Sequence, residues 1–195
     1  MIKYPDGREY SPNKNKTKLS KIEISISSSN RGMGFEEDIN ISNRFYSDHG
    51  VALITKRPTP INVVHVDYTN GPHITDAYFE QQSTTDYNGI YREKYIDFEA
   101  KSTKSKTSFP LANISEHQIE HLSQVIKYGG IAFLIVNFTR LDETYILSAE
   151  QLITFIKTNK RKSIPYQFFK EITMRVTHGY YPRLYYLEAV DKLFF

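Results

Sequence analysis

The chain has 195 residues, which is enough for one full domain and too few for two large ones. It has no cysteine, which excludes disulfides and thiolate metal sites, and it has neither an apolar run of about 18 residues nor an amino-terminal leader. These features predict a soluble cytoplasmic protein without a membrane segment. The formal net charge is only +3, but Lys and Arg gather at residues 14–31, 101–106 and 157–162, which predicts a polarised surface suited to nucleic-acid phosphates.

The amino-terminal segment predicts an arm followed by a helix. Residues 11–30 contain few apolar side chains and several lysines, so we expect residues 1–30 to form a flexible basic arm. Residues 31–34 predict a flexible turn, and residues 35–46 predict a helix with one apolar face. The acids at residues 36–38 would then lie in its first turn, where the helix dipole favours them, although Glu36 could also reach a metal site.

Two strands are predicted next, at residues 51–56 and 61–68, because both segments are rich in apolar and β-branched side chains. Prolines interrupt them and residues 68–73 form a strong turn, so we expect a protruding β stalk at about residues 58–76. No Lys or Arg occurs from residue 58 to residue 91. Any contact of this stalk with DNA would therefore lack permanent positive charge.

The segment at residues 95–101 alternates between apolar and polar side chains, as a strand with one core face does. Its polar face carries Asp97, Glu99 and Lys101. In the whole chain, Glu99-Ala100-Lys101 is the one place where a Lys follows an acid by two residues. The pattern marks this strand as the first candidate for a catalytic site.

Asp86 supplies another acid shortly before this strand. Residues 88–89 are a turn signal and residues 91–95 are a polar, turn-like stretch, so we expect a hairpin or neighbouring elements that bring Asp86 to Glu99. Metal-dependent phosphodiester cleavage uses such acids to hold divalent cations, and a lysine to offset developing charge or to orient the attacking water. The alternative is an exposed strand face with a cross-strand ion pair.

Residues 114–128 predict an amphipathic helix that ends at two glycines, and Ser115 with Gln118 fits a capping box. The helix also contains His117-Gln118-Ile119-Glu120-His121, which matches the inverted zinc-protease pattern of two zinc-binding histidines and a glutamate base. Downstream acids available as a third ligand are Glu143, Glu150, Glu171 and Glu188. A zinc protease is therefore a minor alternative, which leaves the acid-x-Lys strand unexplained.

The remaining segments complete an α/β pattern. Residues 131–138 are continuously apolar, as expected of a central strand buried on both faces, and residues 145–147 predict a further strand. Ser148 caps a predicted helix at residues 149–158, and aromatic-rich helices are expected at residues 166–172 and 184–195. This order predicts a mixed central sheet flanked by helices.

Several of these segments occur together, in the same order, in one known family. They are Met1–Gly7, Asn30–Met33, Lys56–Pro60, Ala77–Phe79, Ser83–Tyr91, Tyr95–Lys101, Lys106–Leu111 and His117–His121. Over nearly its whole length the chain resembles the RecU-type Holliday junction resolvases of Gram-positive bacteria. The resemblance implies a restriction-endonuclease-like fold, an intertwined homodimer, and magnesium-dependent symmetric nicking of two strands at four-way DNA junctions in recombination and repair.

The resemblance also implies roles for individual residues. It places the metal ligands on Thr84, Asp86, Glu99 and Gln118, with about two Mg²⁺ ions per site that Mn²⁺ can replace, and the transition-state-stabilising lysine on Lys101. Asp97 is expected to support the ligands from the same strand face. For Thr84 and Gln118 purely structural roles, in a strand and in a helix cap, stay open because hydroxyl and amide groups bind hard cations weakly.

The expected DNA contacts are Arg31, Lys56, Arg57, Lys104 and Lys106. The resemblance further implies one nuclease domain at residues 31–195, nucleoid association in the cytoplasm, and recombinase and branch-migration proteins as partners. One departure stands out, because family members usually carry a Lys-Arg pair in the stalk where this chain has Thr69-Asn70-Gly71-Pro72. The alternative function is a catalytically silent protein that binds junctions or regulates a recombinase.

Overall fold

A computed structural model describes the backbone of residues 30–79 and 84–195, and the side chains of residues 34–79 and 84–195. The arm predicted at residues 1–30 therefore lies outside the described residues, except for Asn30. Within the described ranges, no helix is long and apolar enough to span a bilayer.

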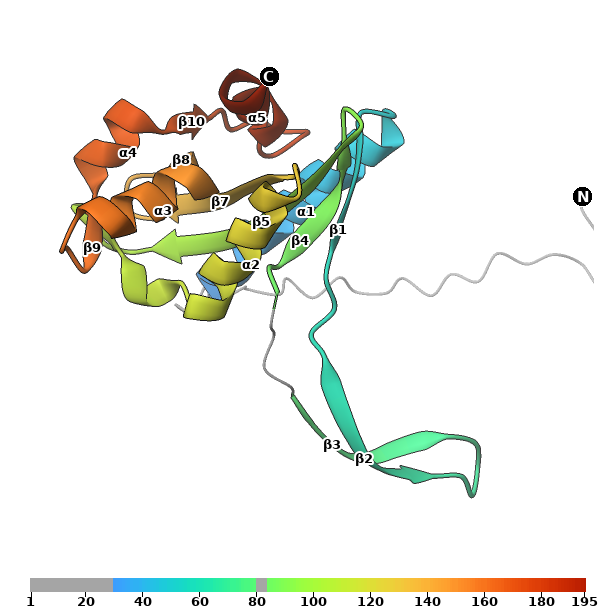
Figure 1. The fold of residues 1–195 in the computed structure, drawn as a ribbon. Helices are drawn as coiled ribbons and strands as arrows, with labels where there is room; N and C mark the ends of the chain where they lie inside the picture. Colours follow the sequence, from blue (N-terminus) through green and yellow to red (C-terminus); the bar gives the residue numbers. More distant parts are fainter. Residues whose placement is uncertain (1–29, 80–83) are drawn as a thin grey trace, which may run out of the picture.

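A six-stranded mixed sheet forms the centre of the body (Figure 1). Its strands run in the order β1-β4-β5-β7-β8-β10, and only the β5–β7 pair is parallel. The bounds are Ala52–Lys56 for β1, Tyr87–Tyr91 for β4, Lys94–Thr103 for β5, Ile131–Phe138 for β7, Glu143–Ser148 for β8 and Met174–Val176 for β10. The mixed α/β fold predicted from the element order is confirmed.

Helices cover both faces of this sheet. Helices α1 (Asn30–Asp48) and α5 (Tyr186–Phe194) contribute side chains to the core on one face. Helices α2 (Glu116–Lys127), α3 (Ala149–Thr158) and α4 (Tyr166–Ile172) contribute to the core on the other. The small elements are a ribbon of β6 (Ser108–Pro110) with β9 (Ser163–Pro165), and the 3₁₀ helix η1 (Leu111–Asn113).

Strand β7 separates the two cores and is buried along its whole length. Phe133 and Ile135 point into the core shared with α1 and α5, whereas Leu134 and Val136 point into the core shared with α2, α3 and α4. The continuous apolar run at residues 131–138 is explained by this position, because both faces of the strand are covered.

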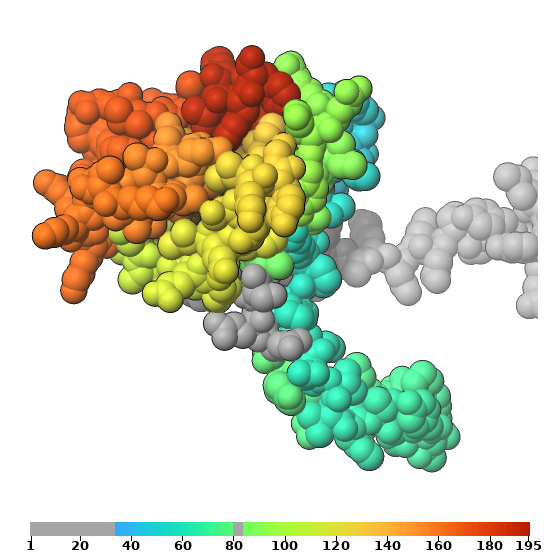
Figure 2. All heavy atoms as spheres, in the orientation of Figure 1, coloured from blue at the N-terminus to red at the C-terminus, as the bar shows by residue number. Residues whose placement is uncertain are grey.

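The β2–β3 hairpin projects from the body (Figures 1 and 2). Strands β2 (Ile61–Asp67) and β3 (His73–Phe79) pair with each other and with no other strand of the described chain. Almost every residue of the two strands is exposed, because a two-stranded ribbon has no sheet or helix behind it. The structure thus places a hairpin where the sequence predicts a stalk.

Three local predictions are wrong. Helix α1 begins at Asn30, so residues 31–34 are helical, and its first turn contains no acid. Residues 88–89 lie inside β4, whereas the turn into β5 is formed by Arg92 and Glu93, both with positive φ, within the turn-like stretch predicted at residues 91–95. Gly89 meets a packing requirement rather than a turn, because a Cβ there would lie 2.0 Å from the backbone oxygen of Leu53 on β1.

Replacing Gly89 with alanine is expected to lower the free energy of unfolding by about 1–3 kcal/mol or more, because β1 and β4 must separate to admit the methyl group. The matched control is Gly34→Ala in α1, where the added Cβ meets no atom within 4 Å. That change should stabilise the helix by about 0.5–1 kcal/mol. Urea unfolding measures both, and a Gly89→Ala protein as stable as the parent would refute the close approach of the strands.

Candidate active site

The polar face of β5 is buried beneath α2 rather than exposed. Asp97 is 0% exposed and Glu99 is 1% exposed, although both side chains are acidic. Ile96 and Phe98 point to the opposite face, into the core with α1 and α5, so the alternation predicted for this strand is confirmed. An exposed strand face, the alternative to a catalytic site, is thereby excluded for the two acids.

The register of β4 against β5 brings Asp86 to Glu99. Tyr87 pairs with Phe98, so Asp86, one residue earlier in the chain, lies beside Glu99. The Asp86 backbone N–H donates to Glu99 Oε2 at 3.0 Å, and the Ala100 N–H donates to Asp86 Oδ2 at 3.1 Å. Two carboxylates thus meet at the edge of a buried site, with Asp86 itself half-buried.

Lys101 and Gln118 both contact the carboxylate of Glu99. Lys101 Nζ lies 2.7 Å from Glu99 Oε1, and Gln118 Nε2 donates to the same oxygen at 2.6 Å. The other end of the Gln118 amide accepts a hydrogen bond from the Ser115 N–H at 3.1 Å, as a capping box requires. The cap predicted for Gln118 is therefore confirmed, and the same side chain also contacts Glu99.

The pKa of Glu99 is raised to about 7, mainly by burial and also by the neighbouring Asp86 carboxylate, while the Lys101 ammonium opposes both effects. Negative charge at this position is costly because little water reaches it. The site therefore favours either a proton or a cation beside Glu99.

The other predicted site residues lie at different distances from this centre. Thr84 is half-buried and lies two residues before Asp86. Lys104 and Lys106 are exposed just beyond the end of β5. Lys56 forms an ion pair with Glu36, the acid of α1 that could have reached a metal site. Glu36 therefore contacts a surface lysine. The backbone of Arg31 lies in α1, and its side chain is outside the described residues.

Arg57 belongs to a cluster of side chains around Asp97, two residues before Glu99 on β5. Its guanidinium Nη2 contacts Asp97 Oδ2 at 2.7 Å, and Nη1 donates to Thr85 Oγ1 at 2.9 Å. Tyr95 and Thr85 also donate hydroxyl hydrogen bonds to the Asp97 carboxylate. Sequence reasoning missed Thr85 and Tyr95. No local sequence pattern identifies them, because the burial of Asp97, which requires such donors, is a property of the fold.

The two histidines of the zinc-protease pattern have separate partners. His117 Nε2 lies 3.0 Å from Ser115 Oγ, and His121 Nε2 lies 3.2 Å from Asp97 Oδ2. Over residues 34–79 and 84–195, no group of three or more His, Cys, Asp or Glu side chains is placed to share a metal ion. The geometry therefore gives the zinc-protease pattern no support. A cation beside Asp86 and Glu99 would need its further ligands from amide, hydroxyl or water oxygens.

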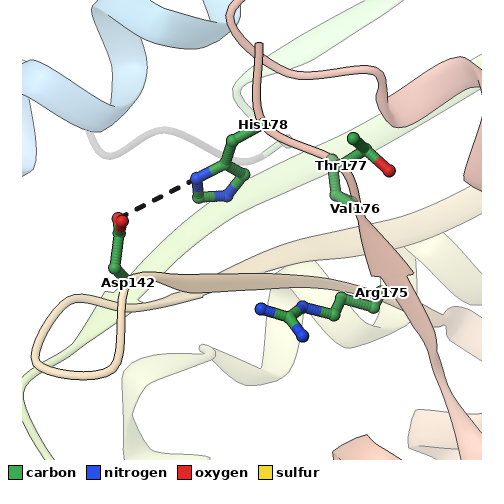
Figure 3. Close-up of a pocket in the computed structure, with 5 residues that line it drawn as sticks. All are labelled: Asp142, Arg175, Val176, Thr177 and His178. Atoms are coloured by element: carbon green, nitrogen blue, oxygen red, sulfur yellow. Dashed lines mark ion pairs between the residues drawn. The ribbon is translucent and has the colours of Figure 1, made fainter.

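A separate hollow lies at the β10 edge of the sheet (Figure 3). It is lined by Asp142, Arg175, Val176, Thr177 and His178. Asp142 Oδ1 lies 3.8 Å from His178 Nδ1, and the Asp142 side chain is 95% exposed. None of the residues predicted from the sequence lines this hollow, so the candidate site remains the one built on β4, β5 and α2.

A family model described as recombination protein U matches residues 30–192. The chain belongs to this family. The family resemblance stated from the sequence segments is therefore confirmed, and the matched region includes Asp86, Glu99, Lys101 and Gln118.

Curated relatives match over most of the chain, and the three described next each bear the name Holliday junction resolvase RecU. One from Geobacillus sp. (strain WCH70) is 46% identical over 200 residues, covering 100% of this chain and 98% of its own length. One from Bacillus licheniformis is 47% identical with the same coverage, and one from Oceanobacillus iheyensis is 53% identical over 86% of this chain and 88% of its own.

Among solved structures, Hjc from Archaeoglobus fulgidus, a Holliday junction resolvase, aligns with a TM-score of 0.45 and 12% identity. The alignment covers 73% of this chain and 94% of that chain.

The raised pKa of Glu99 predicts a pH dependence of stability in metal-free protein. The folded state holds the Glu99 proton more tightly than the unfolded chain, so this contribution is complete below about pH 4.5 and is lost as the pH rises through about 7. Between pH 5 and pH 8 the free energy of unfolding of the parent should fall by up to roughly 3 kcal/mol more than that of Glu99→Gln. Urea unfolding in EDTA at several pH values measures this, and parallel profiles for the two proteins would contradict it.

Proposed function

We propose that this protein is an endonuclease that resolves four-way DNA junctions by paired, symmetric nicks and depends on a divalent cation. The observation that carries the proposal is the contact of Glu99 with both the Asp86 backbone and the Lys101 ammonium, inside a buried site. Relatives named as Holliday junction resolvases, at 46–53% identity, support the choice of substrate. The same names support a role in recombination and repair.

The side chains present suit a hard divalent cation. Asp86 and Glu99 offer carboxylate oxygens, which such cations prefer, and a cation would offset the burial and the neighbouring Asp86 carboxylate that raise the pKa of Glu99. We assign Mg²⁺ as the cofactor, about two ions per site with Mn²⁺ as a substitute, held by Asp86 and Glu99 with help from Thr84 and Gln118. When bound, the cation would supply Lewis acidity toward a phosphate and a water molecule.

The protein's own groups then have distinct tasks. Gln118 fixes the orientation of Glu99, because its amide is held at both ends. The backbone N–H of Ala100 holds Asp86 in the same way. Lys101, whose side chain is 22% exposed, can turn from Glu99 toward a bound phosphate and stabilise the charge that develops there.

Contacts with DNA would come from exposed basic groups around this site. Lys104 and Lys106 follow Lys101 on the same chain segment, and Lys56 lies at the base of the hairpin. The described part of the hairpin, residues 61–79, contains no Lys or Arg. Junction affinity would therefore depend on the body of the molecule, with residues 31–195 acting as one nuclease domain and the arm at residues 1–30 adding further charge.

A homodimer is part of the proposal. One active site cuts one strand, whereas resolution of a junction requires two cuts related by symmetry, so two copies of the chain must act together. A restriction-endonuclease-like fold, association with the nucleoid in the cytoplasm, and contacts with recombinase and branch-migration proteins complete the proposed role. The catalytically silent alternative keeps the fold but would not cut.

Asp86→Asn should reduce cleavage of a four-way junction by more than ~100-fold, because losing a ligand should exceed the ~10–100-fold effect of losing a group that only supports one. Junction binding in EDTA should be preserved, since basic residues provide the affinity. Asp142→Asn, in the separate hollow that no predicted site residue lines, is the matched control and should cut normally. Normal cleavage by Asp86→Asn would refute the assignment of the site, and a parent protein that binds without cutting would favour the silent alternative.

Lys101→Ala should lower the single-turnover cleavage rate by ~100- to 1000-fold, the range seen when a charge-stabilising group is removed. The Mg²⁺ concentration for half-maximal rate should change much less, because lysine is not a metal ligand. A rapid-quench time course at several Mg²⁺ concentrations separates the two effects. An unchanged rate at saturating Mg²⁺ would remove Lys101 from the mechanism.

A further inference from the structure

We propose that Arg57 is a positioning residue that fixes Asp86 in the cation site and ties it to the base of the β2–β3 hairpin, rather than a DNA contact. The inference deepens the proposed function, because it rests on Asp86 being a metal ligand. It is carried by the contacts of Arg57 with the segments on both sides of the hairpin.

Arg57 is the first residue after β1, where the chain leaves the body for the hairpin. Residues 84–86 form the segment by which the chain returns to β4. The Arg57 backbone N–H donates to the Asp86 carbonyl oxygen at 2.8 Å, which continues the β1–β4 ladder by one bond. Both connections of the hairpin are therefore joined at the residue that carries the catalytic carboxylate.

The guanidinium adds a second set of bonds at the same place. Nη1 donates to Thr85 Oγ1 at 2.9 Å, and Nη2 donates to Asp97 Oδ2 at 2.7 Å and to the Tyr95 hydroxyl oxygen at 2.8 Å. Thr85 is fully buried and immediately precedes Asp86 in the chain. Arg57 thus holds Asp86 through its own backbone bond and through the side chain of the preceding residue.

Asp97 is the anchor of this arrangement. Its carboxylate is fully buried and lies two residues before Glu99 on β5. A buried carboxylate is stable only when donors satisfy both oxygens, and here Arg57, Tyr95, His121 and Thr85 do so. These partners restrict Arg57 to one orientation, so the segment before Asp86 and the strand that carries Glu99 are held in a fixed relation.

The arrangement is poorly suited to a phosphate contact. The Arg57 side chain is only 19% exposed, and both terminal nitrogens already have protein acceptors. Moving it to a phosphate would leave the Asp97 charge buried without its cation, which is strongly unfavourable. The planar fork of arginine also contacts Thr85, Tyr95 and Asp97 at once, and lysine has no such geometry.

Arg57→Lys and Arg57→Gln test the proposal through Mn²⁺ binding to DNA-free protein, measured by calorimetry. A positioning role predicts that both variants bind Mn²⁺ about 10- to 100-fold more weakly, while junction affinity in EDTA stays within about twofold. The slope of log affinity against log salt should be unchanged for Arg57→Gln. Arg92→Lys, at an exposed ion pair with Asp191, is the matched control and should bind Mn²⁺ like the parent.

A phosphate contact predicts the opposite pattern. Arg57→Lys would then behave like the parent. For Arg57→Gln, the slope of log junction affinity against log salt would become about 0.9 less steep while Mn²⁺ binding stayed normal. This pattern would overturn the proposal. A parent protein that binds no Mn²⁺ would also overturn it, since Asp86 would have no cation to hold. A parent that binds Mn²⁺ but does not cut DNA would refute the endonuclease and leave the role of Arg57 standing.

Thr85→Val decides the question if the Arg57 variants do not fold. The change keeps the Arg57–Asp97 ion pair and removes the hydroxyl that links it to the segment before Asp86. We expect weaker Mn²⁺ binding with an unchanged circular dichroism spectrum. Parental Mn²⁺ affinity in this variant would overturn the proposal, because the Thr85 hydroxyl is the link between the Arg57 side chain and the segment before Asp86.

Discussion

The polar face of β5 is buried, and the arrangement of the candidate site follows from that constraint. Two carboxylates, Asp97 and Glu99, lie on this face with almost no access to water. Each needs a compensating positive charge, because an isolated buried carboxylate is strongly unfavourable. Asp97 receives it from Arg57, a permanent cation, whereas Glu99 pairs with Lys101 and lies beside a second carboxylate, Asp86. The Arg57–Asp97 pair is suited to holding the fold, and the Glu99–Lys101 pair beside Asp86 is suited to binding an additional cation.

This division explains how one strand can serve both the stability of the fold and the candidate site. Asp97 binds the segment before Asp86 and the base of the hairpin through Arg57 and Thr85. Glu99, two residues later, is oriented by Gln118 from α2 and by the backbone of Asp86. The hairpin therefore leaves the body next to β1 and β4 (Figure 1), where Arg57 and Asp86 share a backbone hydrogen bond beside the candidate site. A DNA junction that engages the hairpin base would lie directly against the site.

Much of this could be predicted from the sequence, where local patterns determine the outcome. The alternation at residues 95–101 identified the faces of β5, and the cap at Ser148 placed the start of α3 correctly. The turn predicted at Gly89 was wrong because a glycine can permit the close packing of two strands as well as a turn. The Arg57–Asp97 pair joins residues 40 positions apart, and no local pattern reports such a contact. Likewise, only the fold shows that Gln118 both caps α2 and contacts Glu99.

The most direct test of the account compares a labelled mobile four-way junction with a linear duplex of the same sequence, each incubated with the purified protein with and without Mg²⁺. The account predicts paired nicks at symmetric positions in the junction, only with Mg²⁺, and little cutting of the duplex. Such a result would also show that the hairpin functions without a basic pair. Cutting that persists in EDTA, or equal cutting of both substrates, would contradict the assignment of a metal-dependent junction resolvase.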